Sequence, residues 1–256
     1  MEKEDLIYGI NPIIEHIKNN KNLNKVYISK NRRDQRIKEI IKLCKSHGIP
    51  YQFVEKEKLS SLSQGKAHQG VIGIMTPFSY LSLKELIDQV SQKDRSFILI
   101  LDKIEDPGNL GSIIRTAACA EISGIVIQRY KSAPLTSTAI KVSEGGVNHI
   151  SIARAGSIIN TIKFLRDAGY TIIGTKMDGD MIYYEQEYPL KTALILGNER
   201  KGLGQKTVEK CDYTVHIPIS PKMESLNVSI SSAILIYEWV RQKSVKIKNF
   251  SYKFNL

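Results

Sequence analysis

The first part of the chain alternates short apolar runs with a stretch of helical period. Residues 25–28, 51–54 and 71–74 are apolar runs of strand length, and residues 37–44 place their apolar side chains at helical spacing. The pattern predicts a small α/β unit that ends near residue 80.

The second part opens with residues 97–102, whose first five form an unbroken apolar run that is typical of a strand buried on both faces of a parallel sheet. Further strands are predicted at residues 124–128, 170–174, 193–196 and 213–217. Helical patterns cover residues 109–120, 156–168 and 228–241. This alternation predicts an α/β unit with a mostly parallel sheet.

The two units predict a simple domain organisation. Residues 81–95 interrupt the strand pattern and end in a polar stretch, so they are expected to form a linker. We therefore expect a first domain at 1–80, a larger α/β domain at 96–243 and a basic tail at 244–256.

Charge points to a polyanionic partner. The 256 residues include 37 Lys and Arg against 26 Asp and Glu, a formal charge of +11. Residues 18–45 hold ten basic residues against two acidic ones, and the chain from Arg241 onward holds five against none. These segments are either two patches that bind phosphates or a solvated helix face and a frayed end.

Cysteine usage and the amino-terminal sequence suggest a reducing, cytoplasmic setting. Cys44, Cys119 and Cys211 are far apart and lack histidines at ligand spacing, so we expect neither disulfides nor a metal site. The charged start at residues 1–5 does not resemble a signal peptide, and the apolar runs are too short to cross a membrane. We therefore expect no membrane partner.

The first motif is residues 106–117, in which a predicted strand is followed by a Pro/Gly turn and a helix. Asn109 and Arg115 are six residues apart, nearly two helical turns, so both can project toward one end of the sheet. Turns of this kind bind ligands in open α/β sheets. The alternative is that Asn109 only caps the helix and Arg115 is a surface cation.

The second motif, residues 194–204, also runs from a buried strand into a glycine-rich turn. Gly197 and Gly202 have the spacing of a phosphate-binding loop, but Leu203 and Gly204 stand where Lys and Ser/Thr would be needed. The sequence therefore argues against a nucleoside triphosphate site. Glycines still permit close backbone approach to a flat ligand, with Glu199 at the mouth of the site.

The third motif, residues 217–229, leaves a strand through two prolines and enters a long apolar helix. Ser225 and Asn227 precede that helix and are either site residues or helix caps. No strand is followed by the G-x-G-x-x-G fingerprint, so a dinucleotide-dependent oxidoreductase is excluded.

Together the three motifs resemble those of the SPOUT superfamily and, within it, the TrmH (SpoU) family of RNA ribose methyltransferases. The first domain, including residues 67–70, is similar to the RNA substrate-binding domain of the bacterial 23S ribosomal RNA guanosine-2'-O-methyltransferase subgroup. The resemblance implies 2'-O-methylation of RNA with S-adenosylmethionine, a trefoil knot in the second domain and a homodimer. Alternatives are a transfer RNA 2'-O-methyltransferase and a catalytically inactive RNA-binding relative.

The resemblance also implies roles for individual residues. The cofactor would be held by backbone groups around Thr175, Leu196, Gly197, Ile217, Ile219 and Leu226. The acceptor ribose would be surrounded by Asn109, Arg115, Glu199, Ser225 and Asn227. The family's proposed base is Arg115, but a guanidinium almost never loses its proton, so Arg115 either takes the proton or stabilises the forming alkoxide. Glu199 would either orient Arg115 or take the proton through water.

Two features depart from the family pattern. Glu144 stands where relatives usually carry a small residue, and residues 220–222 replace a glycine-containing turn before Ser225. We expect these changes to affect the dimer or the rim of the pocket rather than the chemistry.

Overall fold

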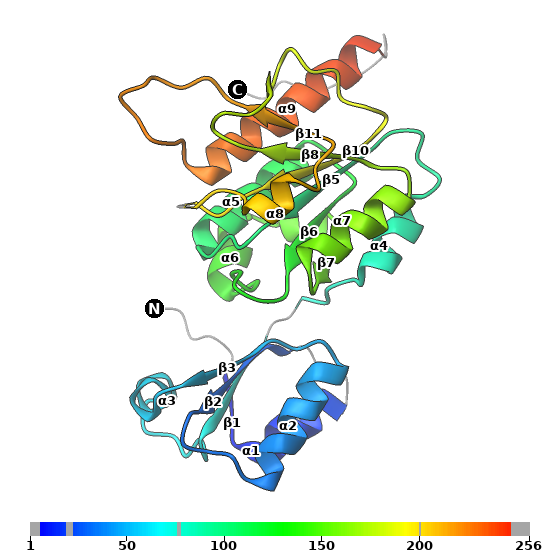
Figure 1. The fold of residues 1–256 in the computed structure, drawn as a ribbon. Coiled ribbons are helices and arrows are strands. Elements are labelled where there is room, and N and C mark those ends of the chain that lie inside the picture. Colours follow the sequence, from blue (N-terminus) through cyan, green and yellow to red (C-terminus); the bar gives the residue numbers. More distant parts are fainter. Residues whose placement is uncertain (1–5, 19–22, 76–77, 200, 247–256) are drawn as a thin grey trace.

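A computed structural model describes residues 6–18, 23–75, 78–199 and 201–246 (Figure 1). They form two α/β units, each built around its own sheet, and the unit that begins the chain lies beside the larger second one. The predicted α/β class and the mostly parallel sheet of the second unit are confirmed.

The first unit is a four-stranded sheet with the strand order β1-β4-β2-β3. Only β2 and β3 pair in parallel; the other pairs are antiparallel. Helices α1 and α2 bury isoleucines against one face, and α3 covers the other. The elements are β1 (Leu6–Tyr8), α1 (Ile10–Lys18), β2 (Leu23–Ser29), α2 (Gln35–Ser46), β3 (Tyr51–Val54), α3 (Lys56–Ser63) and β4 (Val71–Met75).

The second unit is a seven-stranded sheet with the order β7-β6-β5-β10-β8-β11-β9, and all its strand pairs are parallel. Its elements are α4 (Leu83–Val90), β5 (Ser96–Leu101), α5 (Pro107–Cys119), β6 (Gly124–Gln128), α6 (Ser137–Val142), a 3-10 turn η1 (Gly146–Asn148), β7 (Ile152–Ala155), α7 (Ile158–Asp167), β8 (Thr171–Thr175), β9 (Met181–Ile182), β10 (Lys191–Leu196), α8 (Gln205–Val208), β11 (Tyr213–His216) and α9 (Val228–Lys246).

Helices cover both faces of this sheet, as its continuous apolar strands require. Helices α5, α6 and α9 bury their apolar side chains on one face, where Trp239 and Phe97 pack with ring centroids 5.2 Å apart. Helices α4 and α7 cover the other face. The trefoil knot implied by the resemblance stays a prediction.

The segment expected to be a linker contains α4. Ser82 and Glu85 form a capping box at its start, and Leu86 and Val90 are buried against the second sheet. Residues 81–95 are therefore not a free linker in this structure, because α4 packs as part of the second unit. The predicted basic tail begins inside α9, and its residues 247–256 lie outside the described residues.

A buried hydrogen-bonded cluster joins the two units. Asn24, fully buried in the first unit, donates to the carbonyl of Leu135 at 2.8 Å, and its side-chain oxygen accepts from Arg154 at 3.2 Å and from the Tyr80 hydroxyl at 3.1 Å. The Arg154 guanidinium lies 3.9 Å from the centre of the Tyr80 ring. Burial lowers the pKa of Arg154, since its acceptors in this cluster are neutral oxygens. We name Asn24, Tyr80, Leu135 and Arg154 the domain joint.

The Tyr80 hydroxyl is the most connected atom of the domain joint, because it also accepts from the Leu135 N–H at 2.8 Å and from Arg154 at 3.2 Å. We predict that Tyr80→Phe lowers the free energy of unfolding by about 1–3 kcal/mol, since it leaves a buried N–H without its acceptor. Urea unfolding measures this change. Tyr184→Phe, at a half-exposed ring, is the control and should unfold like the wild type.

The same variant has an expected pH signature. Burial raises the pKa of Tyr80 above its ordinary value of 10. The contribution of the Tyr80 hydroxyl to the free energy of unfolding is therefore complete below pH 10 and is lost as the pH rises through the raised pKa. A Tyr80→Phe protein as stable as the wild type at neutral pH would contradict the domain joint.

Candidate active site

The three motifs meet because the strands that precede them are neighbours in the sheet. Strands β5, β10, β8 and β11 lie side by side in parallel, so their carboxyl ends share one edge. The first motif follows β5, the second follows β10, and the third follows β11. This is the edge at which open α/β sheets bind ligands.

One side chain from each motif joins a hydrogen-bonded trio. The Asn109 amide nitrogen donates to Glu199 Oε1 at 3.3 Å, and its amide oxygen accepts from the Asn227 amide at 3.0 Å. Asn109 is not the cap of α5, because Asp106 takes that place and accepts from the Asn109 N–H at 2.7 Å. The Asn109 side chain is therefore free to face the other two motifs.

Asn227 combines the two roles that the sequence left open. Its side-chain oxygen accepts from the backbone N–H of Ser229 at 2.8 Å at the start of α9, as a helix cap does. Its amide nitrogen meanwhile donates to Asn109. The start of α9 is thus tied to the start of α5, and the two helices pack along their lengths.

Asn198 supports this trio and was missed by the sequence analysis. Its amide donates to the carbonyl of Lys103 at 2.8 Å and to Glu199 Oε2 at 3.3 Å. Lys103 has φ of +62°, and its ammonium pairs at 3.1 Å with the buried carboxylate of Asp102. Asn198 therefore holds Glu199 against the turn that follows β5. The sequence signal that could have identified Asn198 is its position next to Glu199 in the second motif.

Arg115 lies outside the trio. Its guanidinium pairs with Glu144 at 2.9 Å, and both side chains are more than half exposed. The close packing of Gly146, whose added Cβ would stand 3.1 Å from the Arg115 Cα, brings this turn against α5. Among the described residues no ion pair joins Arg115 to Glu199, one of the two roles considered for Glu199; the guanidinium pairs with Glu144 instead. Ser225 is exposed in the loop before α9 and makes no hydrogen bond to the trio among the described residues.

Four of the residues expected to hold the cofactor lie at or directly after the strand ends on this edge: Thr175, Leu196, Gly197 and Ile217. Thr175 ends β8 and donates to the Ile195 carbonyl at 3.0 Å, while buried Leu196 ends β10. A Cβ added to Gly197 would collide with the Gly202 carbonyl carbon, so the turn folds back closely onto the strand end. The remaining two residues, Ile219 and Leu226, lie further along the loop between β11 and α9.

The described residues contain no group of three or more His, Cys, Asp or Glu side chains placed to hold a metal ion. None of their helices is both long enough and apolar enough to span a membrane.

Two family models match the chain. The SpoU rRNA Methylase family model matches residues 96–237, which include all three motifs. The model for RNA 2'-O ribose methyltransferase substrate binding matches residues 6–81. The two matches correspond to the two α/β units.

A full-length relative is found in Bacillus subtilis (strain 168). YacO, assigned to the TrmH family of tRNA/rRNA methyltransferases, is 34% identical over 95% of this chain and 98% of its own.

Solved structures share the fold. An rRNA methyltransferase from Sinorhizobium meliloti with AdoMet bound gives a TM-score of 0.59 at 24% identity, over 92% of this chain and 86% of its own. The SpoU methyltransferase AviRb from Streptomyces viridochromogenes, in complex with AdoMet, gives 0.58 at 24% identity, over 94% and 91%.

These matches agree with the motifs and with the order of the two units along the chain. The catalytic-unit model alone spans more than half of the chain, and the Bacillus relative spans nearly all of it. The chain therefore belongs to the SpoU, or TrmH, family of RNA methyltransferases.

Proposed function

We propose that the protein transfers a methyl group from S-adenosylmethionine to a ribose 2'-hydroxyl in RNA, with a guanosine of 23S ribosomal RNA as the target. The observation that carries this proposal is the trio Asn109, Glu199 and Asn227, in which three separate motifs converge on one sheet edge. The match of the first unit to a model for RNA 2'-O ribose methyltransferase substrate binding supports the ribose as acceptor.

The residues at the strand ends fit the proposed cofactor. Ile217 is only partly buried and offers apolar surface, and the close turn at Gly197 brings backbone groups to the strand end, which suits a flat adenine and a thioether-like arm. Related structures hold AdoMet. When bound, the cofactor supplies an electrophilic methyl group on its sulfonium.

The chain's own residues then have to orient the ribose and handle one proton. Asn109 and Asn227 present amide groups next to the Glu199 carboxylate, an arrangement that can orient hydroxyls by hydrogen bonds. Glu199 is the group of this trio that can accept a proton, directly or through water. We assign Arg115 to the neighbouring phosphate or the forming alkoxide, because its guanidinium keeps its proton.

An exposed apolar stripe on α9 supports the proposed homodimer. Ile230 and Tyr237 are 53% and 47% exposed and lie seven residues apart, two turns along one side of the helix. Leu226, in the loop before α9, is 39% exposed. A second copy that covers this stripe would also stand next to the proposed site.

Arg115→Ala tests the catalytic assignment. We predict that the variant binds the cofactor but methylates total RNA about 100- to 1000-fold more slowly, the usual cost of removing one charge-stabilising donor. Glu144→Gln is the matched control, because it removes the ion partner and keeps the guanidinium; it should retain transfer. Transfer with labelled cofactor and mapping of the label measure both effects. Near-normal rates in Arg115→Ala would refute the role, and label in transfer RNA alone would refute the ribosomal target.

Gly197→Ala tests the cofactor site. Because the new Cβ would collide with the Gly202 backbone, we predict at least about tenfold weaker S-adenosylmethionine binding, or 1.4 kcal/mol. Gly204→Ala is the control, since its Cβ would meet open space. Calorimetric titration gives the affinities, and the melting temperature without cofactor checks folding. Equal affinity in the two variants would place the cofactor elsewhere.

Ile230→Glu combined with Tyr237→Glu tests the dimer. Charges on this stripe should prevent burial against a second copy, so light scattering should give the mass of one chain where the wild type gives two. Met177→Glu, at an exposed side chain outside α9, is the control and should leave the mass unchanged. A wild-type mass of one chain would rule out the homodimer.

A further inference from the structure

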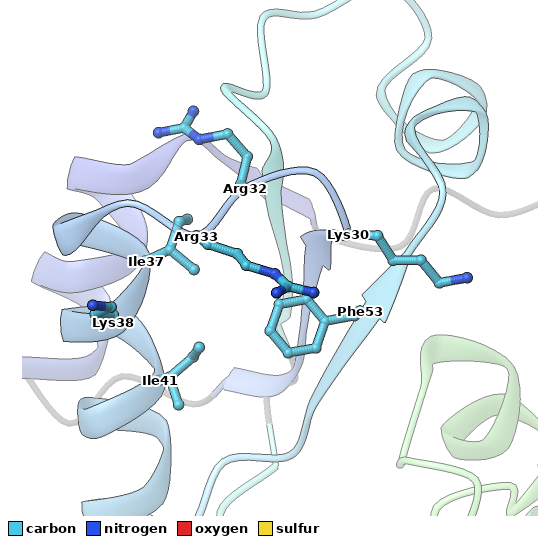
Figure 2. Close-up of a pocket in the computed structure, with 7 residues that line it drawn as sticks. All are labelled: Lys30, Arg32, Arg33, Ile37, Lys38, Ile41 and Phe53. Atoms are coloured by element: carbon cyan, nitrogen blue, oxygen red, sulfur yellow. The ribbon is translucent and has the colours of Figure 1, made fainter.

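The first unit carries an open groove far along the chain from the three motifs. Figure 2 shows the groove between α2 and β3. Its volume is about 460 Å³, within the range of small-ligand sites. The lining residues are Lys30, Arg32, Arg33, Ile37, Lys38, Ile41 and Phe53.

Four of these seven residues are cations, and two of the four form no ion pair with a described residue. Lys30 pairs with Glu55 at 2.5 Å, and Arg32 pairs with Asp34 at 2.6 Å. Arg33 and Lys38 are exposed, and no carboxylate of the described residues lies within ion-pair distance of either. The groove therefore presents two free positive charges, one before α2 and one on its first turns.

The aromatic wall of the groove is open to a ligand. Phe53 lies on the edge strand β3 and is 39% exposed, and it is the one large apolar side chain exposed in the described part of the first unit. By contrast, the Tyr27 ring is covered by the ammonium groups of Lys25 and Lys58, at 4.9 and 5.2 Å from its centre. Phe53 thus offers a ring face or edge in a position where stacking is possible.

A single open ring among cations fits a nucleotide better than a protein. Stable protein interfaces bury a wide area of surface, whereas single-stranded RNA is bound by aromatic stacking beside positive charges. We propose that this groove binds an unpaired nucleotide of the substrate RNA, with its base on Phe53 and its flanking phosphates at Arg33 and Lys38. The inference rests on the proposed function, since it assumes an RNA substrate.

The test compares two RNA probes on the full chain by fluorescence anisotropy: a labelled stem-loop with an unpaired mixed-sequence loop, and the blunt duplex of the same stem. Phe53→Leu keeps the apolar bulk but removes the ring. It should weaken stem-loop binding by about fivefold to a hundredfold and leave duplex binding unchanged. Phe53→Tyr keeps the ring and should bind like the wild type.

The charge contribution is tested by paired variants. Arg33→Ala with Lys38→Ala should lower the salt slope of stem-loop binding by about 1.4, or 0.7 for each single-strand phosphate contact. Lys58→Ala with Lys66→Ala removes the same charge from the same unit outside the groove, where the two lysines lie over tyrosine rings. This control should change the slope by less than the groove variant does.

The outcomes separate this inference from the proposed function. Three results would each overturn the proposed nucleotide site and leave a protein as the alternative ligand. Phe53→Leu could bind the stem-loop as tightly as the wild type, the two paired variants could have equal salt slopes, or the wild type could fail to bind the stem-loop. If the wild type methylates no RNA while Phe53→Leu still loses stem-loop binding, the proposed function fails and the groove stands.

Discussion

The parallel pairing of β5 with β10 is the constraint on which the site depends. Leu101 lies opposite Leu196, so the chain leaves both strands at the same height and the two turns that follow are neighbours. Asn109 and Glu199, ninety residues apart, meet only because of this register. Pairing of β8 and β11 beyond β10 brings the third motif to the same edge. A one-residue slip in these strands would turn their side chains to the opposite face and move the turns apart.

The domain joint gives the first unit a defined place beside the second unit. A guanidinium held by neutral oxygens and an aromatic ring compensates for its loss of water only if its donors are well placed. The two terminal nitrogens of Arg154 bond to Asn24 and Tyr80 and the guanidinium lies on the Tyr80 ring, whereas its buried Nε has no hydrogen-bond partner among the described residues. Such a contact depends strongly on geometry, so it favours one relative placement of the two units. RNA that spans both units would then meet a fixed pair of surfaces.

The hydrophobic pattern of the sequence predicted the elements that carry unbroken apolar runs. It missed elements whose stability depends on contacts with residues elsewhere in the chain. Strands β5, β6 and β10 were found because each contains an unbroken run of buried apolar residues. Strand β7 was missed because Arg154 interrupts it, and only the domain joint explains that arginine. Helix α4 was taken for a linker despite its capping box. The trio was identified through the family resemblance, whereas the partner of Arg115 depends on how Glu144 packs in three dimensions.

The pairing of Arg115 with Glu144 affects how a substrate phosphate can bind the guanidinium. An ion pair between two half-exposed side chains contributes only about 0–1 kcal/mol, because water and salt screen it. A phosphate that enters the site can therefore displace the carboxylate at little cost and form a stronger, bidentate contact with the guanidinium. Glu144 holds φ of +44° in the turn that packs on α5. Because its pair with Arg115 is weak, a phosphate of a nucleic acid backbone does not have to break a strong ion pair to reach the guanidinium.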